Sequence, residues 1–432
     1  MLRQWNALAR YPDFLKLFTA DTISGWGSSI STVALPLTAV VVLDASPLQM
    51  GLLGAATFLP HLVLGLPAGV WVDRMPYRRV LVLADLARAL LLACIPVLAV
   101  LGMLAMWHLY AVAMLAGVGT LFATLAAMSF VPLLVGRAHL LEANSATVQS
   151  ASIVQTIGAA TGGALVQLLT APIAIAADAF SFLVAGLTTM WIRTPGVVAS
   201  GAETSRPLAG EATTTNNPSR QRLWSLVAQG LRATVADPIL RAIVLSATIG
   251  ALAGQMQSVM LVLYLTRQLG LAPGVVGIAI AVSGGAAVLG AFVAGPVTGR
   301  LGHGPTFIAG GLIASTAGLV LATATGPLPL VLGIVLIGQV FAGGGPPLYA
   351  VNQRTIRQSL VAPEMLTRIN ATWRFLVFGA QPVGALLGGV AGGALGLRST
   401  MVVASVGMLT GVAVAVMSPL RTLRTLPGAS GT

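Results

Sequence analysis

The sequence predicts an all-α polytopic membrane protein whose twelve transmembrane helices form two pseudo-symmetric six-helix bundles. Three observations lead to this fold class: the chain is 56% hydrophobic and only 8% charged, long apolar runs alternate with short polar breaks, and the sequence repeats at a fixed interval. Soluble domains carry about 25% charged residues, so too few polar groups are present for a water-exposed surface. The runs are too long for barrel strands and do not alternate, which excludes a β-barrel.

The internal repeat has one constant offset. The segment Ala68-Gly-Val-Trp-Val-Asp-Arg74 returns as Ala294-Gly-Pro-Val-Thr-Gly-Arg300. Asn144, Gly158, Gly162 and Gly163 return 226 positions later as Asn370, Gly384, Gly388 and Gly389. A duplicated membrane bundle is typical of solute transporters.

Each predicted span has the roughly 20 residues that cross a bilayer. The expected limits are 17–42, 48–71, 80–101, 107–130, 145–169, 172–192, 239–264, 274–298, 305–325, 328–350, 368–392 and 398–418. The first six form an N-terminal bundle over 1–194, and the last six form a C-terminal bundle over 238–432. Between them, 195–237 is predicted as a cytoplasmic linker. Its part after 222 is either a short interfacial helix anchored by Trp224 and Leu231 or plain linker.

The distribution of basic residues predicts the orientation. With the N-terminus in the cytoplasm, nineteen Arg and Lys residues lie on the inner side, and only Arg267 and Arg398 lie outside. We therefore expect both termini to be cytoplasmic. The protein is also expected to lie in the bacterial plasma membrane and to act as a monomer. The net charge of +12 is spread singly beside apolar spans, which argues against nucleic-acid binding. The single cysteine, Cys94, excludes an internal disulfide and a Cys metal cluster, and no cofactor or metal is expected.

The loop between spans two and three carries the most specific motif, formed by Gly69, Asp73, Arg74, Arg78 and Arg79. The glycine permits close helix contact, the carboxylate can cap a helix or pair with an arginine, and the arginines anchor the loop at an anionic leaflet. The second copy has glycine where the first has the aspartate. By itself, the motif can be a simple topology determinant.

This loop resembles the signature loop of the major facilitator superfamily, with Pro76 standing where that family has glycine. The wider chain is similar to the drug:proton antiporter branch that includes enterobactin, macrolide and tetracycline exporters. The segments that carry this similarity are Val33–Leu37 (VALPL), Asp85–Ala89 (DLARA), Ala177–Phe182 (ADAFSF) and Gln381–Ala385 (QPVGA). The resemblance implies a major facilitator fold and a cytoplasmic latch between the two halves.

Span five contains Gly158-Ala-Ala-Thr-Gly162-Gly163, which resembles the exporter motif Gly-Pro-x-x-Gly-Gly with Ala159 in place of proline. The missing proline weakens any argument from helix kinking. The glycine spacing still predicts close helix packing, also for the copy at Gly384, Gly388 and Gly389. The basic residue of many exporters in span four is absent, because Ala113 stands there, and this puts direct proton coupling in that helix in doubt.

Charged side chains inside spans cost ~2.5–3.5 kcal/mol each and therefore need a partner or a task. Asp21 begins a polar stripe that continues through Ser24, Ser28 and Thr32 at helical spacing. A carboxylate removed from water can bind a proton. Asp21 is therefore either a site for proton or cation coupling, or a gate hydrogen bond at the level of the interface.

Five further ionisable groups lie within spans. Asp85 and Arg88 are spaced i, i+3, so they are expected to pair and to join the latch. Asp178 is either a helix–helix hydrogen bond or a proton relay, and His61 is either a packing residue or a second protonation site. Arg374 shares a face with Asn370 and Gln381, and we expect it to pair with Asp73 or Glu364.

A substrate cavity of aromatic, Met and Gln side chains suits bulky amphipathic compounds. Ser246, Gln257 and Tyr264 share one face of span seven, whereas Gln255 points nearly opposite, and the spacing does not tell which Gln faces the cavity. The candidates are Trp26, Ser28, Thr32, Phe122, Gln255, Met256, Gln257, Tyr264 and Gln339. The alternative for each is ordinary helix packing. Gly343-Gly-Gly-Pro-Pro347 is expected to break span ten, as a hinge or a helix end.

The leading functional prediction is proton-coupled antiport of amphipathic small molecules or drugs by alternating access, with the substrate, protons and the bilayer as partners. Export of one endogenous metabolite such as a siderophore, an uptake symporter and a non-transporting scaffold are the alternatives. The sequence contains no catalytic or nucleotide-binding motif, so an enzyme is not expected.

Overall fold

The computed structural model describes residues 10–136, 139–193, 229–361 and 363–425. Twelve of its helices are long and apolar enough to cross a membrane, which confirms the predicted number of spans. The first half contains α2 (Pro12–Leu37) with its π-helical extension η1 (Thr38–Val42), α3 (Pro47–Val72), α4 (Tyr77–Val100), α5 (Met106–Val135), α6 (Leu140–Leu168) and α7 (Ala171–Met190). The second half contains α9 (Pro238–Leu263) with its π-helical extension η4 (Tyr264–Gln268), α10 (Pro273–Leu301), α11 (His303–Ala322), α12 (Leu328–Leu360), α13 (Pro363–Leu395), α14 (Leu397–Val416) and the 3₁₀ turn η5 (Pro419–Thr422).

Local sequence fixes the ends of these helices. Ser46 caps α3 through a capping box with Gln49, and proline follows at the first helical position, where no amide donor is needed. Asp237 caps α9 by accepting hydrogen bonds from the amides of Ile239 and Leu240 at 2.8 and 2.9 Å. These caps place the helix ends that frame the two bundles.

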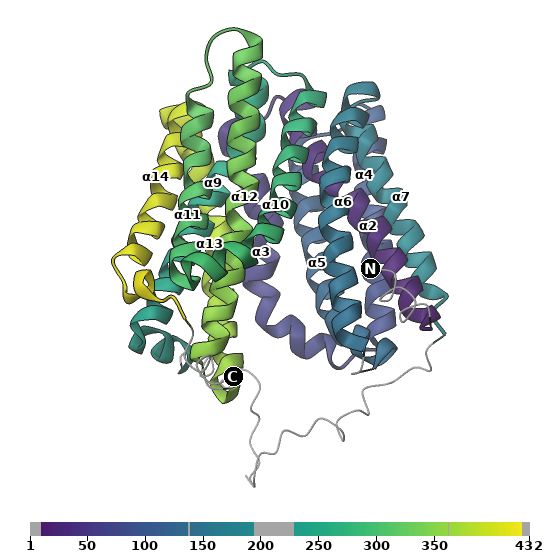
Figure 1. The fold of residues 1–432 in the computed structure, drawn as a ribbon. Coiled ribbons are helices and arrows are strands. Elements are labelled where there is room, and N and C mark those ends of the chain that lie inside the picture. Colours follow the sequence, from purple (N-terminus) through teal and green to yellow (C-terminus); the bar gives the residue numbers. More distant parts are fainter. Residues whose placement is uncertain (1–9, 137–138, 194–228, 362, 426–432) are drawn as a thin grey trace.

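The two bundles stand side by side and meet along two helix pairs, α3 with α13 and α6 with α10 (Figure 1). Since each half has six spans, the first residue of α2 and the last of α14 lie at the same end of the molecule. We call this the terminal end and the other the distal end. The terminal end also carries the α3–α4 turn with the predicted latch motif.

Several helices continue beyond the predicted apolar limits toward the terminal end. α12 runs to Leu360, ten residues past the expected limit at 350, and α13 begins at Pro363 rather than at 368. The expectation that Gly343–Pro347 breaks span ten is wrong, since α12 passes through Pro346 and Pro347 as one helix. Its glycines lie against the backbones of α10 and α11, and such packing by neighbours lets membrane helices tolerate proline.

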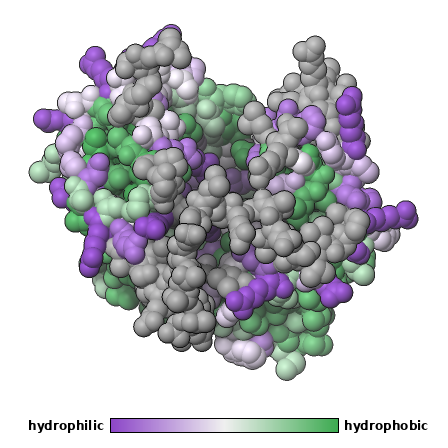
Figure 2. Space-filling model, turned by 90° about the horizontal axis from the view of Figure 1, so that it is seen from below, coloured by the Kyte–Doolittle hydropathy of each residue, from purple (hydrophilic) through white to green (hydrophobic). Residues whose placement is uncertain are grey.

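The halves touch at the distal end and separate toward the terminal end. Gly51, Gly54, Gly65 and Gly69 occupy one face of α3, the face that meets the second half. A β-carbon at Gly51 would lie 2.8 Å from the α-carbon of Gly389, whereas one at Gly65 or Gly69 would meet no atom within 4 Å. The view from the terminal end shows hydrophilic side chains projecting around the rim of this end (Figure 2).

The same divergence occurs on α10. Its Gly277 packs against α6, but Gly295 and Gly299 on the same face have no neighbouring atom within 4 Å. The conformation is therefore closed at the distal end and open at the terminal end.

The linker is described only in its last part. Residues 229–236 are helical, Leu231 is exposed, and the segment packs against α13, where Arg368 donates a 2.7 Å hydrogen bond to Gln229. Trp224 and the polar stretch 195–222 lie outside the described residues.

Candidate functional site

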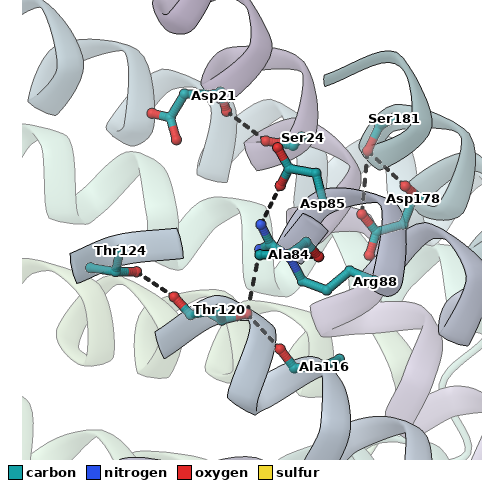
Figure 3. Close-up of polar contacts among 10 residues, drawn as sticks. All are labelled: Asp21, Ser24, Ala84, Asp85, Arg88, Ala116, Thr120, Thr124, Asp178 and Ser181. Carbon is teal, nitrogen blue, oxygen red and sulfur yellow. Dashed lines mark hydrogen bonds and ion pairs between the residues drawn. The ribbon is translucent and has the colours of Figure 1, made fainter. Parts of the chain in front are cut away.

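A cluster of charged side chains lies between α2, α4, α5 and α7 inside the first half (Figure 3). Asp85 and Arg88 form an ion pair on α4, as their spacing predicts, and both side chains are buried. The Arg88 guanidinium also donates to the Ala84 carbonyl at 3.2 Å and to the Thr120 hydroxyl at 3.5 Å. Its flat face lies 4.1 Å from the centre of the Phe182 ring. Helices α4, α5 and α7 therefore hold this guanidinium in place.

Asp178 is the most deeply buried carboxylate of the cluster, with 2% of its surface exposed. The Ser181 hydroxyl donates to the Asp178 main-chain carbonyl at 2.8 Å and lies 3.4 Å from the carboxylate. Because one hydroxyl has one proton, the shorter bond directs the Ser181 proton to the main chain, and the Ser31 hydroxyl of α2 is the other polar group beside the carboxylate. Gly27 of α2 makes room for this group, since a β-carbon there would lie 2.6 Å from the Asp178 carboxylate and would also overlap Ser181. The sequence prediction did not identify Gly27.

Asp21 completes the cluster on α2, and it is exposed. Arg88 lies close enough to Asp21 and Asp178 to interact with both electrostatically. Neither carboxylate forms an ion pair within the part of the chain that the structure describes. The cluster thus joins three carboxylates to one guanidinium, with two negative charges in excess if all are ionised.

The polar stripe of α2 continues from Asp21 through Ser28, which is half-buried, to Thr32, which is exposed. Ser24 is buried instead. Thr120 and Thr124 of α5 are also exposed one turn apart, and Thr120 contacts Arg88. These two threonines were not predicted, although their spacing of four residues in an apolar helix was a readable signal.

The predicted latch residues do not contact the second half in this conformation. Asp73 and Arg74 are exposed, and Asp73 forms no ion pair with any described residue. Arg78 donates to the carbonyl of Met190 at the end of α7, which ties the motif to its own half. Arg79 is exposed, and Gly69 faces open space. Asp85 and Arg88 belong to the buried cluster rather than to this turn.

His61 and Arg374 meet across the boundary between the halves. His61 of α3 lies between Phe58 and Phe378, with ring centres 6.5 and 6.1 Å away. Arg374 of α13 is exposed, and its guanidinium lies 5.8 Å from the Phe378 ring. No carboxylate among the described residues pairs with Arg374.

The shared face predicted for span seven is present, but it packs inside the second bundle. Gln257 accepts a 3.4 Å hydrogen bond from Ser405 of α14. Tyr264 is completely buried and donates a 2.7 Å hydrogen bond to the Leu321 carbonyl of α11. Gln255, on the nearly opposite face, is half-buried, and the nearby Gly254 faces open space. Gln255 thus remains the candidate of the two glutamines for contact with substrate.

Other residues predicted to line the cavity pack against neighbouring helices instead. Gln339 is 2% exposed inside the second bundle, and Met256 lies against Gly388. Phe122 stacks on Trp71 with ring centres 6.3 Å apart. It lies two residues and thus about 200° from Thr120 around α5, away from the charge cluster. Trp26 is half-buried against the core of the first half.

The six glycines of the predicted packing motif lie at helix crossings. Gly158 and Gly162 hold α6 against α2, and Gly384 and Gly388 hold α13 against α9. Gly163 and Gly389 join the two halves, to Gly277 and Gly51 respectively. The 226-residue repeat relates these two contacts, because it carries Gly51 to Gly277 and Gly163 to Gly389. The distal closure is therefore two copies of one glycine-on-glycine contact.

One ion pair also bridges the halves at the distal end. Arg267, in η4, lies 2.5 Å from the Asp44 carboxylate and 3.4 Å from the Val40 carbonyl. Asp44 has a positive φ of 49° and a side chain that is 94% exposed. Exposed ion pairs are screened by water and salt and contribute at most ~1 kcal/mol.

We therefore expect Asp44→Asn to destabilise the distal closure only slightly, shifting the equilibrium toward distal opening by less than about fivefold. Labelling of a cysteine introduced near the distal end, in a Cys94→Ser background, measures this shift. High salt should produce the same shift in the unchanged protein and none in the variant. A larger shift that salt does not reproduce would contradict this account.

Comparisons with known proteins agree with this architecture. Residues 4–430 match the family described as transmembrane secretion effector, of the major facilitator superfamily. The chain is 29% identical over 419 residues to the multidrug efflux pump Tap of Mycolicibacterium fortuitum, covering 95% of this chain and 96% of that protein. It is 27% identical over 437 residues to Tap of Mycobacterium tuberculosis, covering 97% and 96%.

Among solved structures, the nucleoside transporter NupG superposes with a TM-score of 0.71 at 12% identity, covering 94% of this chain and 98% of NupG. This similarity concerns the fold. Together with twelve spans in two bundles, the family match over nearly the whole chain shows that this protein belongs to the transmembrane secretion effector family of the major facilitator superfamily and is a multi-pass membrane transporter of small molecules.

Proposed function

We propose that this transporter exports amphipathic small molecules, including drugs, in exchange for protons, by alternating access in the bacterial plasma membrane. The terminal end then faces the cytoplasm, in keeping with the nineteen basic residues that the sequence assigns to the inner side, and the present conformation is open to the cytoplasm. Export by the Tap proteins supports the direction of transport. The monomer is sufficient, since the opening lies between two halves of one chain.

The observation that carries the proposal is the charge cluster of Asp21, Asp85, Arg88 and Asp178. Asp85 pairs with Arg88, whereas Asp178 is buried between membrane helices without an ion pair in the described structure, where uncompensated charge is expensive. Uptake of protons removes the excess negative charge. Asp21 is the exposed member, so we propose that protons enter the cluster there and that His61, at the boundary between the halves, is a secondary protonation site.

The proposed cycle links this cluster to the movement of the halves. The cluster lies on helices of the first half, and Gly27 places α2 directly against Asp178 of α7. Protonation changes the charge at this α2–α7 contact, so it can favour one arrangement of the helices over the other. The motif of Gly69, Asp73, Arg74, Arg78 and Arg79 is proposed to engage the second half when the terminal end closes.

The test is dye efflux in everted membrane vesicles energised by a proton gradient. We expect Asp21→Asn to reduce proton-driven transport by about tenfold or more, the usual loss when a proton-transferring group is removed. Asp13→Asn is the matched control, since Asp13 lies on the same helix but pairs with Lys16 at the terminal end. Its transport should stay near that of the unchanged protein and should stop when an uncoupler is added.

Full proton-driven transport by Asp21→Asn would remove Asp21 from the coupling role. Transport by the unchanged protein that is insensitive to the uncoupler would remove proton coupling as a whole.

A further inference from the structure

The wall of the opening formed by α13 carries an exposed cation whose charge is not balanced. Arg374 is exposed, and its guanidinium lies 5.8 Å from the centre of the Phe378 ring. Within 238–432 the sequence contains one acidic residue, Glu364. That position is ten residues earlier on the same helix, about 15 Å along its axis, which is too far for direct pairing.

A second guanidinium, that of Arg357, lies against the residue that precedes Arg374 in the sequence. Arg357 of α12 is buried and lies 4.6 Å from the ring centre of Trp373, the residue next to Arg374. It forms no ion pair with a described carboxylate, and its Nε is buried without a hydrogen-bond partner among the described residues. The side chains of Arg374 and Arg357 therefore both lie along the same stretch of α13.

Polar groups without partners surround Arg374 on its own face. Asn370 and Gln381 follow the helical spacing of Arg374, and each has a buried side-chain oxygen without a partner in the described structure. His61, which approaches from the first half, has a buried Nδ1 in the same condition. Its ring and the Arg374 guanidinium both lie near Phe378. Unsatisfied polar groups around a cation at the edge of an opening are suited to a polar ligand.

We propose that Arg374, with His61, Asn370, Gln381 and Phe378, forms a subsite for the carboxylate end of an amphipathic substrate. The Arg374 guanidinium donates to the carboxylate, and the amide oxygens of Asn370 and Gln381 accept from N–H or O–H groups elsewhere on the substrate. Phe378 packs against the apolar or aromatic body. The inference rests on the proposed export function and specifies its substrates. Asp21 is an exposed carboxylate of the first half and Arg374 an exposed guanidinium of the second, so the transporter is expected to accept zwitterionic as well as cationic amphiphiles.

A matched pair of dyes tests the subsite by direct binding. A rhodamine ethyl ester carries one positive charge, and its free acid adds a carboxylate to the same body. Fluorescence anisotropy with the purified full chain should show that Arg374→Gln weakens binding of the free acid by about tenfold or more, as expected for loss of a charged hydrogen-bonded pair. Binding of the ester should change by less than about twofold. Arg374→Lys should restore most of the affinity for the free acid.

Arg300→Gln is the control for loss of one positive charge, because Arg300 is exposed at the end of α10. It should bind both dyes like the unchanged protein. Equal weakening of both dyes, unchanged binding of the free acid, or no binding of the free acid by the unchanged protein would each overturn the subsite. Loss of efflux of both dyes in Arg374→Gln with unchanged binding would assign Arg374 to gating instead and would also overturn it.

Failure of the carboxylate subsite and failure of the proposed export function give different results. Proton-driven efflux of the ester by Arg374→Gln shows that export persists without the subsite. Absence of such efflux in the unchanged protein rejects the export function, whatever the binding comparison gives.

Discussion

Arg88→Gln is expected to destabilise the protein strongly and to abolish most transport. The substitution removes the single guanidinium of the cluster and leaves Asp85 buried beside the uncompensated carboxylates Asp21 and Asp178. Breaking a buried ion pair from one side costs ~3–5 kcal/mol, since the remaining charge keeps its desolvation penalty. Thermal unfolding in detergent measures the loss of stability, and vesicle efflux measures the loss of transport.

The double variant Arg88→Gln with Asp85→Asn separates charge from packing. Removing both charges of the pair should recover much of the stability, because no unpaired partner is left on α4. Transport should stay low if the guanidinium also organises Asp21 and Asp178. Arg300→Gln, at an exposed position, should leave stability unchanged. An Arg88→Gln protein as stable as the unchanged chain would contradict the assignment of Arg88 as the cluster's counter-charge.

The fold was predictable because hydropathy and repetition are properties of the chain itself. Twelve apolar runs correspond to the twelve helices, and the 226-residue offset related the halves. The ends were less accurate, since a helix such as α12 continues into the polar region wherever nothing interrupts its hydrogen bonds. The length of an apolar run predicts the part of a helix that crosses the membrane. Where the helix ends also depends on the polar residues beyond that run.

The site was predictable only where one helix contains both partners. The pair Asp85–Arg88 follows from a spacing of three residues, but the approach of Asp178 and Asp21 depends on how α2 and α7 are rotated against α4. The rotation of a helix about its own axis also explains why Tyr264 is buried. The sequence predicted that Tyr264 shares a face with Gln257, but not that this face points into the second bundle. In such a protein, the residues that face lipid, pack against other helices or line a cavity are all largely apolar. The helical period alone therefore does not distinguish them.

Substitution of a glycine at the distal contact is expected to have the second large effect. On α10, the structure predicts a large effect for Gly277→Ala and none for Gly295→Ala. A β-carbon at Gly277 would lie against the backbone of Gly163, and the reverse substitution would place one 2.5 Å from the α-carbon of Gly277. Rotation of a side chain cannot relieve an overlap with backbone, so Gly277→Ala must push α10 away from α6. Overpacking of this kind costs about 1–3 kcal/mol.

That cost falls only on the conformation closed at the distal end, so we expect Gly277→Ala to shift the equilibrium toward distal opening by roughly tenfold or more. Spin labels at Met103 and Thr325, exposed in loops of the two halves at the distal end, should report a larger population at long distance. Gly295→Ala, on the same face of α10, should leave the distance distribution unchanged, since that β-carbon meets open space. Equal behaviour of the two variants would show that the glycine contact does not control closure. A shift with Gly277→Ala that exceeds the shift with Asp44→Asn would mean that the distal closure depends more on the close approach of the paired glycines than on the exposed Asp44–Arg267 pair.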